Sequence, residues 1–328
     1  KIVFSGVGKT RQELALALEK DILQINIESV PELERLNDVA KSLRKTASVA
    51  LRINPDIDAG SHDKISTGRK EDKFGIEFPI VREIFNRAAA LENIKPVGLA
   101  VHIGSQLTDL GPFEIAFLKL RDMVALLRAE GHDIKRLDVG GGLGIPYDGT
   151  DVPSPSAYGQ VVANTLGDLE CDLLFEPGRI IVGNAGLLVA RVLYVKEGSA
   201  RDFVIIDAAM NDLIRPSLYG ARHEIVTVTE TPEDEVMHLV DVVGPVCETG
   251  DTFATELLMP SVDQDDLLAL RSSGAYGAVM ASTYNSRSLV PEVLVKEDQF
   301  AVVRERVSIN ELLHHEKIPN WLPEAPKK

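Results

Sequence analysis

The regular alternation of short apolar runs with longer helical patterns is the feature of this sequence that most constrains its fold. Six runs rich in β-branched and aliphatic residues occur in the first half of the chain, at residues 2–4, 23–27, 49–53, 97–103, 136–139 and 172–175. Between them, apolar residues recur at helical spacing over residues 11–20, 30–42 and 113–130. Strands that alternate with helices form βαβ units, so we predict a parallel sheet covered by helices.

The sequence changes character near residue 186, where helical patterns almost disappear. Strand-like runs follow one another at residues 187–196, 203–206, 224–228, 236–243, 278–281 and 291–296, with helical patterns only at 262–270 and 309–314. We therefore predict two domains, a (β/α) domain over residues 1–185 and an antiparallel β domain over residues 186–328. The Pro-rich segment from Pro319 is expected to be an exposed terminus.

Charge and cysteine content exclude several classes of protein. The chain has 328 residues with 35 basic and 50 acidic side chains, a net charge of −15 that argues against nucleic acid or an anionic membrane as the main partner. Residues 180–195 are the most apolar stretch, but Asn184 and Arg191 interrupt it and it is too short to span a bilayer. The two cysteines, Cys171 and Cys247, give no disulfide framework, which fits a reducing, cytoplasmic setting.

Residues with useful chemistry follow three of the predicted strands. His-Ile-Gly-Ser-Gln (102–106) follows one strand, Gly-Gly-Gly (140–142) the next, and Glu-Pro-Gly-Arg (176–179) the third. The carboxyl ends of parallel strands meet at one edge of the sheet, so these segments should lie together. Consecutive glycines let backbone N–H groups converge on an anion, and the imidazole, carboxylate and guanidinium suit an aromatic ring. We predict a site for an aromatic cofactor that carries a phosphate.

The glycines match neither common nucleotide-binding motif. A dinucleotide fingerprint that starts at Gly140 needs glycine at position 145, which is Ile145. A P-loop that ends in Gly-Lys-Thr (8–10) needs glycine at position 3, which is Val3. A nucleotide hydrolase is therefore a weak alternative, and a flexible strand-to-helix turn is the simplest other interpretation of the glycine run.

The second half contributes three polar clusters on predicted loops, at residues 211–219, 244–251 and 273–278. Cys247 lies beside Glu248 between two glycine-containing pairs, so we expect it on a loop where its thiol can react. A small core residue next to a surface charge is the more ordinary interpretation of such a cysteine, and it stays open. Two cysteines without histidines at ligand spacing give no metal site.

Six segments, in this order, resemble the diaminopimelate decarboxylases, a family of fold-type III pyridoxal-phosphate decarboxylases. They are Val-His-Ile-Gly-Ser-Gln (101–106), Gly-Gly-Gly (140–142), Glu-Pro-Gly-Arg (176–179), Arg-Pro-Ser-Leu-Tyr (215–219), Gly-Pro-Val-Cys-Glu (244–248) and Ser-Gly-Ala-Tyr (273–276). The second and third are shared by the wider superfamily, whereas 215–219 and 247–248 are more specific. The resemblance extends from residue 1 to about residue 284. It implies a TIM-like (β/α)8 barrel followed by the β domain.

The resemblance also implies pyridoxal 5′-phosphate as the cofactor. His102 would stack on the pyridine ring, and Glu176 would pair with the ring nitrogen and keep it protonated by its opposite charge. Further contacts to the cofactor, chiefly to its phosphate, would come from Ser105, Gly140, Gly141, Gly142, Pro177, Gly178 and Arg179. Tyr276 would touch both the cofactor and the substrate.

The substrate that the resemblance implies is meso-2,6-diaminopimelate, decarboxylated to L-lysine and carbon dioxide. Its distal carboxylate would be gripped by Arg179, Arg215 and Tyr219, and its distal ammonium by Glu248. Lysine or ornithine would be rejected because they leave buried polar groups of the site unpaired. Cys247 would be catalytic beside His102, as the proton donor to the decarboxylated carbon. In this family Cys247 and Glu248 serve the active site of the other chain in a head-to-tail homodimer.

One departure from the family is large. Its members attach the cofactor to a Schiff-base lysine on the first barrel strand, in a Tyr-Ala-Leu-Lys-Ala-Asn type segment that this sequence lacks. We find six of the eight barrel strands before residue 186, so we expect two strands and the lysine to precede Lys1. No lysine of the sequence is assigned this role. A smaller departure is Thr283, where many members carry Asn.

Two other functions stay open. A decarboxylase of another basic amino acid, of the ornithine or arginine type, would share the cofactor residues. A non-catalytic relative would bind a cofactor or a partner after losing the lysine.

Overall fold

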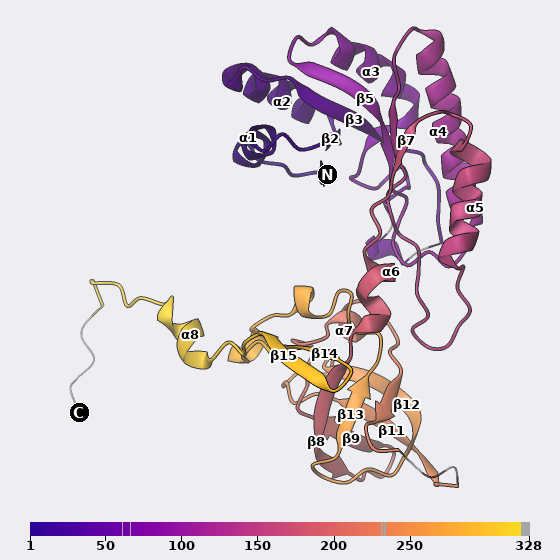
Figure 1. Cartoon of the computed structure of the whole chain (residues 1–328). Coiled ribbons are helices and arrows are strands. Elements are labelled where there is room, and N and C mark those ends of the chain that lie inside the picture. Colours follow the sequence, from indigo (N-terminus) through magenta and orange to yellow (C-terminus); the bar gives the residue numbers. More distant parts are fainter. Residues whose placement is uncertain (61, 66, 231, 233, 323–328) are drawn as a thin grey trace. The chain divides into compact units, whose positions relative to one another are not determined.

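The chain folds into two compact units, Lys1–Ile181 and Val182–Lys328. The structure is a computed structural model that describes residues 1–60, 62–65, 67–230, 232 and 234–322. The first unit contains a parallel sheet with helices against it, and the second consists mainly of strands (Figure 1).

The sheet of the first unit places its strands side by side in the order of the chain. The path is β1 (Val3–Phe4), β2 (Gln24–Ile27), β3 (Ala47–Asn54), β5 (Ile94–Val101), β6 (Arg136–Asp138) and β7 (Asp172–Leu174), and all neighbours are parallel. A short strand, β4 (Ile76–Glu77), pairs with the end of β3. Parallel neighbours in chain order are the arrangement of a (β/α) barrel, so the predicted fold class is confirmed.

The α-helices of the first unit are α1 (Arg11–Glu19), α2 (Val30–Leu43), α3 (Val81–Ala90), α4 (Gly111–Ala129), α5 (Pro155–Leu166) and α6 (Arg179–Val182). Of these, α1, α2 and α5 begin at a side-chain cap supplied by Thr10, Ser29 and Ser154. At the start of α1, the Thr10 side chain accepts from the Glu13 amide while the Glu13 carboxylate accepts from the Thr10 amide. Gly131 follows α4 with φ of 89°, a conformation that favours glycine. Sequence periodicity did not predict α3 or α5.

The core of the first unit lies between the sheet and its helices. All of β2 and nearly all of β3 are buried, which is typical of parallel strands covered on both faces. The bulkiest fully buried side chains come from the helices, with Phe85 on α3 and both Phe113 and Phe117 on α4. Their burial fixes the helices against the sheet, and with them the loops at the carboxyl ends of the strands.

The second unit is built on a six-stranded sheet and a separate hairpin. The sheet has the order β10 (Ile225–Thr227), β13 (Leu267–Leu270), β8 (Leu188–Lys196), β9 (Asp202–Ile206), β11 (Met237–Val243) and β12 (Thr252–Pro260). Its pairs are antiparallel apart from β9 with β11, which are parallel. The hairpin joins β14 (Glu292–Lys296) to β15 (Gln299–Arg304), and the unit also carries α7 (Arg215–Tyr219) and α8 (Ile309–His314).

Two sequence predictions for the second unit are wrong. Residues 262–270 are not helical, because the apolar residues gather in the final four, Leu-Leu-Ala-Leu, which form β13, a strand paired on both sides in the sheet. Residues 278–281 are not a strand, because Ala278–Met280 form a single 3₁₀ turn. Close packing at Gly277, where a Cβ would lie 2.4 Å from the Ser273 carbonyl oxygen, keeps this segment in a turn.

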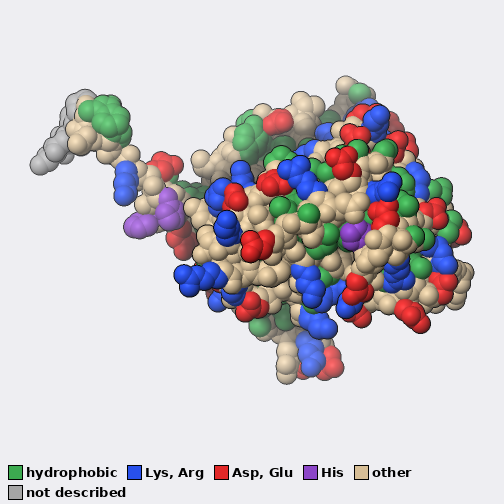
Figure 2. All heavy atoms as spheres, turned by 90° about the horizontal axis from the view of Figure 1, so that it is seen from above, with side chains coloured by type: hydrophobic (Ala, Val, Ile, Leu, Met, Phe, Trp, Pro, Cys, Tyr) green, Lys and Arg blue, Asp and Glu red, His purple; other side chains and the backbone are tan. Residues whose placement is uncertain are grey.

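The surface agrees with the mixed composition. Acidic and basic side chains are interspersed on the face that Figure 2 shows, and no large area of that view carries one sign of charge. Within the described residues, no helix is long and apolar enough to cross a membrane.

The packing of α4 leads to a stability prediction. Phe117→Ala should lower the free energy of unfolding by about 3–5 kcal/mol, because Phe117 is 1% exposed and its loss leaves a cavity. Ile115→Ala on the same helix is the control, since Ile115 is 51% exposed, and it should change stability by at most about 0.5 kcal/mol. Denaturant unfolding of the full-length protein measures both values. Equal losses would contradict this orientation of α4.

Candidate active site

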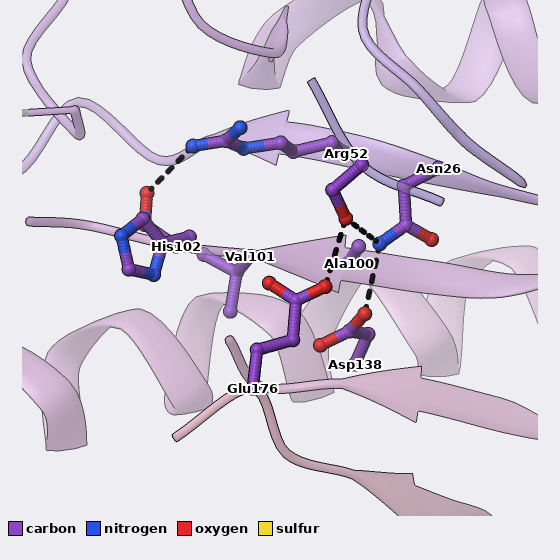
Figure 3. A pocket seen from close by; sticks show the side chains of 8 residues that line it. Asn26, Arg52, Ala100, Val101, His102, Asp138 and Glu176 are labelled. Atoms are coloured by element: carbon purple, nitrogen blue, oxygen red, sulfur yellow. Dashed lines mark hydrogen bonds between the residues drawn. The ribbon is translucent and has the colours of Figure 1, made fainter. Parts of the chain in front are cut away.

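A pocket opens at the carboxyl edge of the parallel sheet. Its volume is about 40 Å³, and its lining comes from six strands and the segments after them: Ser5, Asn26, Arg52, Ala100, Val101, His102, Asp138 and Glu176 (Figure 3). Most of these side chains are polar, although the strands that carry them are buried. Buried polar groups are stable only when they pair with one another, and here they do so.

A row of hydrogen bonds joins four of the lining residues (Figure 3). The Asn26 amide nitrogen donates to Asp138 Oδ2 at 2.8 Å and to Ser5 Oγ at 2.9 Å. The Ser5 hydroxyl in turn donates to Glu176 Oε1 at 2.8 Å. The row connects β2, β6 and the segments after β1 and β7, so it fixes the position of the Glu176 carboxyl group.

Arg52 brings a positive charge to the other end of the pocket. Its guanidinium forms an ion pair of 2.7 Å with Glu28, and both side chains are buried. A second nitrogen of Arg52 donates to the His102 carbonyl oxygen at 3.4 Å. The ion pair compensates the burial of both charges and ties β3 to the loop that carries His102.

His102 is held as a neutral imidazole. Removal from water and the nearby charge of Arg52 lower the pKa of His102 to about 4, against a smaller opposite effect of Glu176. The Gly141 amide donates to His102 Nδ1 at 3.2 Å, which assigns the ring proton to Nε2. A neutral ring in a fixed orientation is suited to stacking on another aromatic ring.

The three glycines after β6 allow neighbouring loops to approach closely. A Cβ at Gly140 would lie 2.5 Å from the Val101 carbonyl oxygen, and one at Gly141 would lie 2.2 Å from that of Glu176. Gly142 has φ of 102°, and its Cβ would lie 2.2 Å from the Gly104 carbonyl oxygen. Any side chain here would push apart the loops that follow β5, β6 and β7, so the glycines are a steric requirement.

Arg179 and Ser105 form a polar pair beside the glycine run. The buried Arg179 guanidinium donates to Ser105 Oγ at 3.0 Å and also to the Tyr147 hydroxyl. Pro177 and Gly178 are exposed in the turn before it, and no atom outside the turn lies within 4 Å of a Cβ built on Gly178. A guanidinium, a hydroxyl and an open turn are together suited to an anion such as phosphate.

The predicted residues of the second unit gather around α7 and two loops. Arg215, at the start of α7, is buried and contacts His223 Nε2 at 2.6 Å, while His223 Nδ1 contacts the Arg271 carbonyl oxygen at 2.8 Å. Tyr219 ends the same helix and is half-buried. Tyr276 has φ of 57° and is 40% exposed.

Cys247 and Glu248 are both exposed on the loop between β11 and β12. Cys247 is a free thiol on this loop, as predicted, and not a core residue. A hydrogen bond from Tyr284 to Glu248, together with the charge of Glu248, raises the pKa of Tyr284. A Cβ at Gly250 would lie 3.3 Å from Ser217 Oγ, which shows that this loop lies against α7.

Asp251 holds this loop in place. It is buried, and its carboxylate accepts the Met210 amide at 2.6 Å and the Val246 amide at 2.7 Å. A Cβ at Gly244 would lie 2.3 Å from the Asp251 carboxylate, so only glycine fits there. Cys247 therefore follows directly after a residue whose backbone is anchored.

Several important residues were missed from the sequence: Ser5, Asn26, Arg52, Asp138, Tyr147, Asp251 and Tyr284. One signal could have revealed three of them, because Asn26, Arg52 and Asp138 are polar residues inside apolar strand runs. Lys9, from the motif that resembles a P-loop, is instead buried in hydrogen bonds to Gly6, Asn26 and Glu32.

Comparison with known proteins defines the class. Residues 1–183 match the family model described as pyridoxal-dependent decarboxylase, pyridoxal binding domain. The chain belongs to the pyridoxal-dependent decarboxylase family.

Relatives within the family carry a more specific name. Diaminopimelate decarboxylase from Zymomonas mobilis is 48% identical over 324 residues, which cover 98% of this chain and 76% of the relative. The Neisseria meningitidis serogroup A enzyme of the same name is 46% identical over 316 residues, which cover 96% of this chain and 77% of the relative. The predicted resemblance to the diaminopimelate decarboxylases is therefore confirmed.

Solved structures of similar proteins lead to the same family assignment. A Helicobacter pylori diaminopimelate decarboxylase complexed with L-lysine has a TM-score of 0.91 at 42% identity, over 95% of this chain and 77% of that one. A viral arginine decarboxylase is 19% identical with a TM-score of 0.76, which shows a shared fold alone.

The pocket, together with the polar pair of Arg179 and Ser105 at the ends of the neighbouring strands, fits pyridoxal phosphate. The neutral His102 ring offers a flat face, Glu176 offers a carboxyl group for a ring nitrogen, and Arg179 with Ser105 offers donors for a phosphate. The acidic and basic groups lie at different strand ends, as a ligand with a cationic ring nitrogen and an anionic phosphate requires.

The neutral state of His102 can be tested by NMR. The imidazole should titrate with a midpoint near pH 4 in the full-length protein, and His102→Gln identifies its signal. An unfolded histidine has a pKa of about 6.5, so the unfolded state binds a proton that the folded state excludes between these values. Between pH 6.5 and about pH 4, each unit of acidification should therefore lower the free energy of unfolding by up to about 1.4 kcal/mol. His102→Gln should remove this pH dependence. A midpoint at or above the ordinary histidine value would contradict the assignment.

Proposed function

We propose that this protein binds pyridoxal 5′-phosphate at the carboxyl edge of its parallel sheet and decarboxylates meso-2,6-diaminopimelate to L-lysine and carbon dioxide. The observation that carries the proposal is the 46–48% identity to enzymes named diaminopimelate decarboxylase over nearly the whole chain, through both units. The pocket chemistry supports it, because its residues suit the ring, the ring nitrogen and the phosphate of this cofactor.

The residues of the first unit would hold the cofactor. When bound, pyridoxal phosphate supplies an electron sink for the electron pair that departing carbon dioxide leaves behind. Glu176 keeps a proton on the ring nitrogen, and His102 stacks on the ring without adding charge. Ser105, Arg179 and the turn at Gly140–Gly142 hold the phosphate, and Pro177 and Gly178 shape the exposed turn before Arg179.

The residues of the second unit would select the substrate. Arg215 and Tyr219 bind the distal carboxylate together with Arg179, since the planar guanidinium matches a carboxylate with two parallel hydrogen bonds. Glu248 binds the distal ammonium, and its hydrogen bond with Tyr284 orients the carboxylate. Tyr276, exposed on its loop, contacts the cofactor and the substrate.

Cys247 would return the proton. Its thiol is exposed on a loop that Asp251 anchors, so it can approach the carbon that has lost its carboxylate. We also propose that the protein is a cytoplasmic homodimer in which Cys247 and Glu248 act on substrate bound to the other chain. Their exposure on the surface of the second unit supports this arrangement.

A substrate panel tests the function. The full-length protein with pyridoxal phosphate should release carbon dioxide and lysine from meso-diaminopimelate. It should leave lysine, ornithine and arginine unchanged, because these amino acids lack the distal carboxylate of diaminopimelate. Chromatography of the amines and carbon dioxide capture measure both products. Turnover of ornithine or arginine without diaminopimelate would establish the sibling activity instead.

Cys247→Ala should lower turnover at least about 100-fold, because the proton donor is lost. The absorbance of the bound cofactor should persist, since Cys247 lies outside the unit that matches the pyridoxal-binding domain. Cys171→Ala, a change of the other free thiol, is the matched control and should keep normal turnover. Near-normal turnover of Cys247→Ala would show that another group gives the proton.

The same variant tests the shared site. Mixing inactive Cys247→Ala and His102→Ala chains should restore about a quarter of the wild-type activity, because a mixed dimer then contains one intact site. No recovery, with subunit exchange shown by differently labelled chains, would place both units of each site on one chain.

A further inference from the structure

The carboxyl group of Asp138 has no role in the function proposed above, although it lies in the pocket. It belongs to β6, it is 1% exposed, and both of its oxygens accept hydrogen bonds from N–H groups. Oδ1 accepts the Gly140 amide at 2.9 Å, and Oδ2 accepts the Asn26 side chain at 2.8 Å. Gln24 donates to Asn26 at 2.9 Å and so orients that donor.

Glu176 lies next to this anchored carboxylate. Figure 3 shows the two side chains facing each other from neighbouring strand ends. Partial removal from water, then the negative charge of Asp138 and a hydrogen bond between the two carboxyl groups, raise the pKa of Glu176. Two ionised carboxyl groups that lie side by side repel each other, so their proximity favours a proton on one of them.

The hydrogen bonds show which group holds it. Asp138 accepts two N–H donors, and such donors favour the ionised form of a carboxyl group. Glu176 accepts from the Ser5 hydroxyl, a weaker stabiliser of negative charge. Of the two groups, Glu176 is therefore the one on which a proton is favoured.

The other charged and titratable groups near the pair come from four elements. His102 after β5 is neutral, and Arg52 on β3 forms an ion pair with Glu28, which follows β2. Tyr158 on α5 is the fourth group. Burial, and then the charge of Asp138, raise the pKa of Tyr158 and keep its phenol neutral. Asp138 thus remains the main charge that acts on Glu176.

We propose that Asp138 is a positioning residue that disfavours ionisation of Glu176 while the site lacks cofactor, so that Glu176 can pass a proton to the ring nitrogen when pyridoxal phosphate binds. The O–H bond of Glu176 breaks as the N–H bond forms, which leaves a carboxylate beside a ring cation. Asp138 then adds a second negative charge near that cation and holds the proton on the nitrogen more firmly than Glu176 would alone. This inference rests on the proposed function only for the identity of the ligand.

Carbon-13 NMR of the cofactor-free full-length protein, labelled at glutamate side-chain carboxyls, tests the pair directly. Glu176→Gln identifies the Glu176 signal. In the wild type this signal should titrate above the ordinary glutamate value of about 4.3, and in Asp138→Asn its midpoint should fall by about one pH unit or more. An unchanged midpoint in Asp138→Asn, or an ordinary one in the wild type, would overturn the proposal.

Two further variants separate this role from a general effect on folding. Ser5→Ala removes the hydroxyl donor and should raise the Glu176 midpoint, the opposite direction to Asp138→Asn. Asp241→Asn changes a buried aspartate on β11, in the other unit, and should leave the midpoint unmoved. A shift of the same sign in Ser5→Ala and Asp138→Asn would refute the inference.

Addition of pyridoxal phosphate to the same samples completes the test. In the wild type the Glu176 signal should move to its ionised position as the absorbance of the bound cofactor appears. A wild-type protein that binds the cofactor while Glu176 stays protonated would overturn the inference and leave the proposed function intact. A protein that binds no pyridoxal phosphate would contradict the proposed function, and the carboxyl titration would still decide whether Asp138 controls Glu176.

Discussion

The pairing of polar side chains at the carboxyl edge of a parallel sheet is the constraint on which the site depends. Asn26 and Asp138 are buried in strands that the core requires to be covered on both faces. Each would cost several kcal/mol if left without a partner there. Their mutual hydrogen bond removes that cost, and through Ser5 it also fixes Glu176. The geometry of the site is thus a consequence of keeping the polar strand residues satisfied.

The sequence predicted the strands of the first unit well because their apolar runs are continuous and separated by helical patterns. It predicted the site residues His102, Gly140–Gly142 and Glu176 by their place after strands, and their roles stay predictions. It did not reveal the row from Ser5 to Asp138, because hydrogen-bond partners 112 residues apart, such as Asn26 and Asp138, are set by strand order and not by local pattern. In the second unit β13 was mistaken for a helix, since a four-residue apolar run carries no period of its own.

In the second unit, the exposed loop between β11 and β12 is held by a buried side chain. Cys247 and Glu248 are exposed to solvent, so burial of their own side chains cannot fix them. Asp251 does so, because its buried carboxylate accepts the Val246 amide inside the loop and the Met210 amide of the segment that follows β9. An anchor of this kind lets the exposed Cys247 thiol keep a defined position while remaining accessible.

The distribution of charge around His102 explains why a neutral ring is needed between Arg52 and Glu176. A protonated imidazole would be repelled by Arg52 and attracted by Glu176, and it would compete with a cofactor ring nitrogen for that carboxylate. Burial and Arg52 prevent this competition, and the Gly141 amide occupies the nitrogen that would otherwise take the proton. In the proposed function, burial and the cation of Arg52 thus keep His102 from competing with the ring nitrogen of the cofactor for the Glu176 carboxyl group.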